Sequence, residues 1–88
     1  MKITDTMLES MIDGVEEQIQ TRNPIETQET YQLLLNNGYS SKDAKKKIAV
    51  AIAVESFAII KTGKPFNRER YIQNLKRIQN GKGADPVK

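Results

Sequence analysis

Apolar positions along this chain repeat with helical spacing, and the stretch from Ala44 to Ile60 is its most apolar part. It reads AKKKIAVAIAVESFAII, and from Ile48 to Ile60 only Glu55 and Ser56 are polar. No single apolar stripe can be drawn through this run. A helix that is apolar on all sides must be covered by other elements or by a partner chain. The pattern therefore predicts a long central helix around which the rest of the chain packs.

An amphipathic helix is predicted before this run. Thr6, with a glutamate three residues later, is typical of a capping box, and Thr4 is an alternative cap. The helix should end near Arg22, because Pro24 disfavours helical geometry at Asn23. Its apolar positions follow the i, i+3, i+4, i+7 pattern: Met7, Leu8, Met11, Ile12, Val15 and Ile19.

A second helix should begin with Asn23 as its cap and Pro24 at its first position. Gly38 suits the left-handed position after its last turn, where Tyr39 can fold back onto Leu34. We expect its core side to be Ile25, Tyr31, Leu34 and Leu35.

Caps also delimit the third and fourth helices. Ser40 or Ser41 can cap the third helix, and Gly63 should end it. Asn67 can cap the fourth helix, which should end at Asn80. Phe66 comes directly before this cap and can pack against Tyr71 as a hydrophobic staple. The predicted inward stripe of the helix is Tyr71, Ile72, Leu75 and Ile78.

Four helices with short connections predict an all-α fold: a small four-helix bundle around the long apolar third helix, with antiparallel neighbours in up-down-up-down order. We expect one domain over residues 1–80 and a disordered tail over residues 81–88. Three shorter helices can leave part of the central helix uncovered. Because large exposed apolar patches are rare on monomers, a homodimer through that face is a hypothesis.

The composition argues against most enzyme classes. The 88 residues include no cysteine and no histidine, which removes thiol chemistry, the commonest general base and the commonest transition-metal ligand. We therefore expect a non-enzyme without cofactor or metal. The apolar run of 13 residues is shorter than the roughly 20 residues that span a bilayer, so we expect no membrane segment. Residues 1–12 lack a signal-peptide pattern, and the expected location is the cytoplasm.

Charge is unevenly distributed along the chain. Residues 1–39 carry two cationic residues against seven carboxylates, and residues 40–88 carry twelve against four, so the halves are −5 and +8 and the total is +3. The acidic first helix can pack beside the basic later ones, or a basic surface can bind an acidic partner. The candidate residues for partner or nucleic-acid contact are Lys45, Lys46, Lys64, Arg68, Arg70, Lys76 and Arg77.

Glu55 is the residue that the apolar pattern does not explain. One interpretation is a buried carboxylate in a polar network, or a metal ligand beside acids of the first helix. The other, which we favour, is a carboxylate at the rim of the core paired with an arginine, a lysine or a tyrosine hydroxyl. The acids of the first helix itself are best explained as a solvated helix face: Glu9, Asp13, Glu16 and Glu17.

The spacing of several caps and core positions also resembles a known family. These positions are Pro24, Tyr31, the leucine pair 34–35, Gly38, Asp43-Ala44, Glu55, Gly63–Phe66, Tyr71 and Leu75. Residues 23–78 are similar to the helical end of an uncharacterised bacterial all-helical domain family of unknown function. The resemblance implies a bacterial source and supports the helix boundaries, and it brings no activity with it.

Two function classes follow from these patterns. We favour a non-catalytic protein–protein interaction module that can self-associate, because the central helix supplies more apolar surface than its neighbours need. The alternative is a nucleic-acid-associated accessory protein that uses the basic surface of residues 42–77. Against this alternative, the third helix turns apolar after one turn, whereas a recognition helix needs a polar outward face.

Overall fold

Four helices make up most of the protein in the computed structural model, which describes residues 2–81. Their bounds are α1 Asp5–Thr21, α2 Ile25–Asn36, α3 Ser41–Thr62 and α4 Arg68–Gln79. No strand occurs between residues 2 and 81, so the all-α fold class is confirmed. The tail expected over residues 81–88 lies outside the described residues, apart from Gly81.

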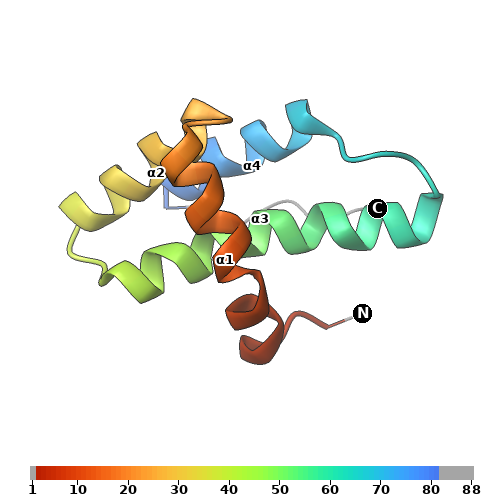
Figure 1. Cartoon of the computed structure of the whole chain (residues 1–88), viewed down its shortest axis with the longest axis horizontal. Helices are drawn as coiled ribbons and strands as arrows, with labels where there is room; N and C mark the ends of the chain where they lie inside the picture. The colour runs from red at the N-terminus through yellow and green to blue at the C-terminus, as the bar shows by residue number, and fades with distance from the viewer. Residues whose placement is uncertain (1, 82–88) are drawn as a thin grey trace.

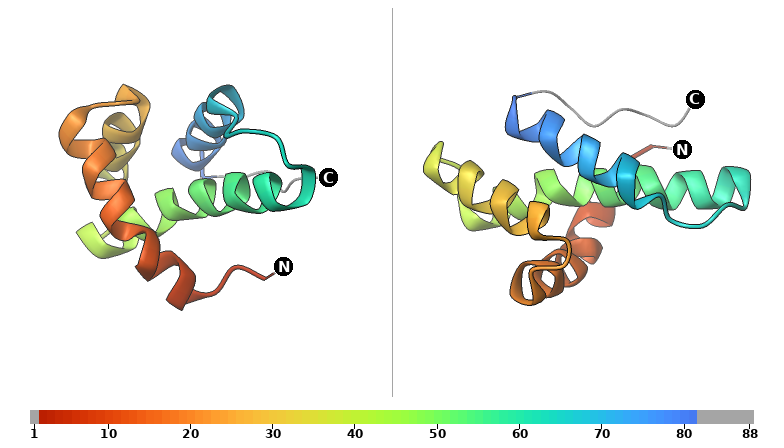
Figure 2. Two further views of the ribbon diagram at one scale, coloured as in Figure 1. Left: turned by 45° about the vertical axis from the view of Figure 1, so that its right-hand side comes forward. Right: turned by 90° about the horizontal axis from the view of Figure 1, so that it is seen from above.

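The long third helix forms the axis of the molecule. α3 lies along the longest dimension of a body of 36 × 25 × 23 Å, and α2 and α4 pack together against it (Figure 1). α2 and α3 each contact all the other helices. The arrangement departs from a regular up-down-up-down bundle at α1, which crosses α3 obliquely (Figure 2). Arg22 ends α1 in the left-handed conformation, with φ 54°, and the chain turns there toward α2.

The core forms around α3 from Ala44 to Ala58. Its buried positions on this helix are Ala44, Ile48, Ala49, Ala51, Ala53, Val54, Glu55 and Ala58. Four of the other residues that enclose them are Val15, Leu34, Tyr71 and Leu75. The covering ends at Ala58, because Ile59 and Ile60 are 40% and 66% exposed. The last turn of α3 extends past α1 and α2 (Figures 1 and 2) and is the part of the central helix that the three shorter helices leave uncovered, as the sequence allowed; its covering by a second chain stays a prediction.

Local capping chemistry fixes most helix ends as predicted. The Ser40 and Asn67 side chains accept hydrogen bonds from the first turns of α3 and α4, at 3.1 and 2.9 Å. Gly63 ends α3 with φ 70°. At the end of α2, Tyr39 donates its backbone N–H to the Leu34 carbonyl at 3.1 Å, which is the predicted fold-back.

Of the two caps considered for α1, Thr4 is confirmed and Thr6 is wrong, and the cap predicted for α2 is wrong as well. The cap of α1 is Thr4, whose backbone is extended as a cap requires and whose hydroxyl accepts from the Met7 N–H at 3.3 Å. Thr6 already lies inside the helix. Asn23 does not cap α2, because Pro24 occupies the cap position. Instead, the Asn23 side chain accepts a hydrogen bond from Arg68 Nη1 at 3.1 Å.

The buried face of α2 differs from the predicted one. Ile25 was expected in the core and is 43% exposed, whereas Thr27 and Thr30 are fully buried. Thr30 donates to its own helix backbone and accepts from Gln79 Nε2 at 2.8 Å. A threonine whose hydroxyl is hydrogen-bonded can be buried at little cost, so polar residues here take positions that the apolar pattern assigned to others.

A hydrogen-bonded group of three side chains, two of them fully buried and Gln18 half-buried, joins α1, α2 and α4. The Tyr71 hydroxyl and the Thr27 hydroxyl both donate to Gln18 Oε1, at 2.7 and 2.9 Å, and lie 3.1 Å from each other. Burial raises the pKa of Tyr71 to about 12, because the phenolate would lose its hydration, and the hydrogen bond with Thr27 partly opposes this rise.

This raised pKa predicts a loss of stability in alkali. The folded state keeps its proton on Tyr71 above the ordinary pKa of 10.0, so the stability is fully present below pH 10 and is lost as the pH rises toward 12. The full loss corresponds to about 2–3 kcal/mol, at 1.36 kcal/mol per pKa unit. Chemical denaturation at several pH values should show this slope in the wild type and a shallower one in Tyr71→Phe. Equal slopes in the two proteins would contradict the assignment.

Candidate interaction surface

Glu55 anchors the connection between α3 and α4. Its side chain is fully buried, and both carboxylate oxygens are used. Oε2 accepts from Arg70 Nε at 2.5 Å, and Oε1 accepts from Arg70 Nη2 at 3.0 Å and from the backbone N–H of Asn67 at 2.9 Å. The carboxylate is thus paired with an arginine, as in the interpretation we favoured, but it lies inside the core and not at its rim.

The ion pair with Glu55 also determines the charge state of Arg70. Its pKa is raised because Glu55 accepts its hydrogen bonds, and partial burial opposes this rise. The guanidinium therefore stays charged and holds the first turn of α4 against α3. Because Glu55 also accepts from the backbone N–H of Asn67, the chain is held both at the α4 cap and within the first turn of α4.

The chain between the two helices forms an ordered turn. Thr62 Oγ1 accepts the backbone N–H of Lys64 at 3.2 Å, and Asn67 caps α4. The Phe66 ring packs edge-on against Tyr71 with centroids 5.4 Å apart, which places both residues as the predicted hydrophobic staple. The turn is thus tied to the folded body at its start, at its aromatic residue and at its end.

This ordered turn is also the most exposed stretch of the fold. Every residue from Ile59 to Glu69 is exposed, and we call this segment the α3–α4 turn. It carries three of the large exposed apolar side chains, Ile59, Ile60 and Phe66, which is 43% exposed. Its charged residues are Lys61, Lys64, Arg68 and Glu69. The segment forms the end of the molecule that projects beyond α1 and α2 (Figure 2).

The sequence-predicted basic residues do not form one surface. Lys45 pairs with Glu16 at 3.0 Å, and Lys46 pairs with Glu9 at 3.5 Å, which is the contact between acidic and basic helices that the charge distribution allowed. Arg70 is bound to Glu55. The other four candidates lie at the α3–α4 turn and in the last part of α4: Lys64, Arg68, Lys76 and Arg77.

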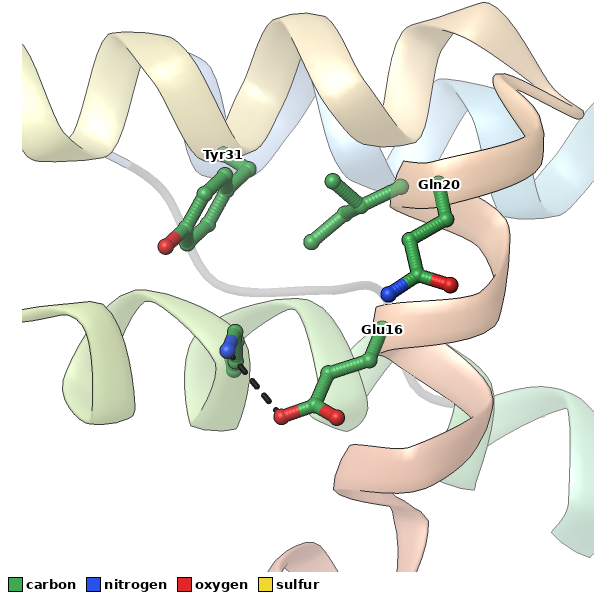
Figure 3. A pocket seen from close by; sticks show the side chains of 5 residues that line it. Glu16, Gln20 and Tyr31 are labelled. Atoms are coloured by element: carbon green, nitrogen blue, oxygen red, sulfur yellow. Dashed lines mark hydrogen bonds and ion pairs between the residues drawn. The ribbon is translucent and has the colours of Figure 1, made fainter.

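A hollow of about 300 Å³ lies where α1, α2 and α3 meet. Glu16 and Gln20 reach toward it from α1, and Tyr31 enters it from α2 (Figure 3). Lys45 ion-pairs with Glu16 there and lies 5.7 Å from the centroid of the Tyr31 ring. The two charges neutralise each other, so the hollow presents no unpaired charge that would orient a ligand.

The acidic residues of α1 also lie apart from any metal-binding geometry. Glu9 and Glu16 pair with lysines of α3, at 3.0–3.6 Å. Over residues 2–81, no group of three or more side chains of the metal-binding types His, Cys, Asp and Glu is placed to hold an ion. Within the same range, none of the helices combines the length and hydropathy needed to cross a bilayer.

Sequence reasoning did not identify Ile59 and Ile60 as surface residues. The apolar pattern assigns both to the central run and does not indicate which of its residues the other helices leave uncovered. The available signal was the position of Gly63, because the last turn before a helix end contacts fewer neighbours than the helix middle.

Comparison with protein-family models, with curated proteins and with solved structures finds no match for this chain.

Proposed function

We propose that this protein is a non-catalytic protein–protein interaction module that binds its partner through the α3–α4 turn. The observation that carries the proposal is the exposure of Ile59, Ile60 and Phe66 on a segment fixed by Glu55. Apolar side chains on an anchored turn lose little conformational freedom when a partner covers them, and this lowers the cost of association.

The fold itself supports a binding role for this surface. Ile59 and Ile60 lie on a helix whose earlier apolar residues are all buried or half-buried, so their exposure does not follow from a general shortage of covering helices. Exposed apolar residues that occur singly need no explanation, whereas residues gathered in one segment are typical of interaction sites.

Nucleic-acid binding receives less support. Lys42, Lys45 and Lys46 are paired with carboxylates of α1, and Arg70 is paired with Glu55. Cations that already hold an internal counter-charge release fewer phosphate counterions on binding, and that release supplies most non-specific affinity. The basic surface of residues 42–77 is therefore smaller than the sequence suggests.

Site-specific photo-cross-linking in cells of the native source tests the proposal. A photo-reactive phenylalanine analogue in place of Ile60 should give a discrete covalent adduct, while the same analogue in place of exposed Gln32 on α2 should not. Mass spectrometry identifies the adduct, and the purified partner should bind the purified protein. Equal or absent cross-linking at both positions would contradict the proposal.

Self-association is a separate hypothesis about the same surface. Sedimentation equilibrium of the wild type and of Ile60→Ser measures it directly. A dimer that dissociates in the variant would make a second copy the partner, and a monomer of 10.0 kDa at high concentration would exclude it.

A further inference from the structure

Resting on the proposed function, we propose that the α3–α4 turn binds an acidic amphipathic segment of a different protein, with large apolar side chains flanked by carboxylates. The turn combines three exposed apolar side chains with three cations within eleven consecutive exposed residues. A partner segment that complements this surface is apolar where it meets the isoleucines and Phe66, and anionic where it meets the cations.

The charge of the turn selects an acidic partner. Lys61, Lys64 and Arg68 outnumber Glu69, and the only other carboxylate close in sequence, Glu55, is buried and used by Arg70. Among residues 2–81, no carboxylate forms an ion pair with Lys61 or Lys64. These cations remain available to a partner, unlike those of the first half of α3.

A second copy of this chain fits the surface poorly. A two-fold interface places the same patch on both sides, so the lysines of one turn would face the lysines of the other. A head-to-tail contact would need an acidic surface with exposed apolar side chains. On α1, Asp5, Asp13 and Glu17 are exposed and no large apolar side chain is, and on α2 the exposed Glu29 has a single exposed large apolar neighbour, Ile25, against three such side chains on the turn.

An anionic membrane also fits poorly. A helix that lies in the lipid interface needs a continuous apolar face of several turns. Here the exposed apolar residues of α3 are confined to its last turn, because its apolar residues up to Ala58 are buried or half-buried. A partner helix needs less, since two or three apolar anchors at i, i+3 and i+4 can seat against Ile59, Ile60 and Phe66.

The two kinds of contact have different roles in binding. The apolar contacts supply most of the affinity, and the lysines orient an acidic segment and increase its association rate. Binding should therefore weaken with added salt, but only modestly, because the apolar contribution does not depend on screening.

Selection from a displayed library of random peptides tests the inference on the full chain. Peptides are selected on the wild type and counter-selected on Ile60→Ser, and binding of the enriched peptides is measured by fluorescence anisotropy. We expect enriched sequences with two or three large apolar residues flanked by Asp or Glu. Their affinity should fall about tenfold for Ile60→Ser and about fivefold for the Lys61→Glu/Lys64→Glu double variant.

The matched control is Lys47→Glu, which reverses an exposed charge near the other end of α3. It should change the affinity less than about twofold, and circular dichroism should show all variants folded, because the changed residues are exposed.

Other outcomes overturn the inference in distinguishable ways. Enriched peptides with neutral or basic flanks that still require Ile60 would reject the acidic partner and leave the proposed function in place. Self-association lost in Ile60→Ser would do the same by making the partner a second copy. Binding to vesicles with phosphatidylserine, lost in the lysine double variant, would replace a protein partner by a membrane. Failure to enrich any peptide that depends on Ile60 would reject the inference, and cross-linking then decides the proposed function separately.

Discussion

Replacing Arg70 by alanine lowers the free energy of unfolding by about 2–4 kcal/mol, near the lower end of the range for breaking a buried ion pair, because Glu55 is fully buried but the Arg70 side chain is 35% exposed. The variant leaves the Glu55 carboxylate fully buried without its cation. The backbone N–H of Asn67 is then the only hydrogen bond that remains to Glu55 among those the structure shows. Urea denaturation followed by circular dichroism measures the change.

The matched control is Arg68→Ala, an arginine two positions earlier on the same helix. Arg68 is exposed and donates to the neutral Asn23 side chain, so its loss should cost less than about 1 kcal/mol. The Glu55→Leu/Arg70→Leu double variant should be more stable than Arg70→Ala, because no buried charge is left unpaired. Equal costs for Arg70→Ala and Arg68→Ala would show that Glu55 does not depend on its partner.

The ion pair also connects stability to the proposed interaction surface. Glu55 holds Asn67 and Arg70, and these two residues set where the α3–α4 turn meets α4. An Arg70→Ala protein that remains folded should therefore bind the partner peptide more weakly, although Arg70 contacts Glu55 and is not one of the exposed apolar residues of the turn. Loss of preorganisation, with every exposed side chain still present, explains the weaker binding.

Features decided by neighbours in sequence were predictable. The ends of α2, α3 and α4 follow from Gly38, Gly63 and Asn67, because a left-handed glycine or a capping side chain acts within a few residues of itself. The all-α class followed from helical periodicity for the same reason. Thr4 and Thr6 were both reasonable caps by composition, and only the backbone conformation at Thr4 decides between them.

Features decided by distant partners were not predictable. Thr27 is buried because its hydroxyl meets Gln18 and Tyr71, 9 and 44 positions away, and no local pattern reveals such partners. The left-handed conformation at Arg22, where the chain turns from α1 toward α2, was likewise not predictable, because arginine has no local preference for a positive φ. Helical periodicity assigns buried positions by apolarity alone, so it predicts Ile25 and not Thr27 as a core residue of α2.

The candidate site shows the same division. Glu55 could be recognised from the sequence, because a carboxylate inside an apolar run needs an explanation. Its partner could not be recognised, since Arg70 is one of many cations and lies 15 positions away. The exposure of Ile59 and Ile60 depends on where α1 and α2 stop along α3, which is a property of the assembled bundle and not of the helix that carries them.

The two isoleucines Ile48 and Ile60 give a direct comparison between the covered and uncovered parts of α3. Ile48 is fully buried, and Ile48→Ala should lower the free energy of unfolding by about 2–5 kcal/mol, through lost apolar burial and the cavity that remains. Ile60 is 66% exposed, and Ile60→Ala should change it by less than about 0.5 kcal/mol. Both variants make the same chemical change in the same helix, so helix propensity contributes equally and cancels in the comparison.

Partner binding should show the opposite order. Ile60→Ala should weaken binding of the selected peptides, whereas Ile48→Ala should leave it unchanged at temperatures where the variant is still folded, because Ile48 lies in the core and Ile60 in the exposed turn. Urea denaturation and fluorescence anisotropy on the same protein samples measure the two effects. A large stability loss in Ile60→Ala would mean that the last turn of α3 is packed in solution, and the surface on which the proposed function depends would then not exist. A small loss in Ile48→Ala would contradict the position of the core itself, since a fully buried isoleucine cannot be shortened to alanine without lost contacts.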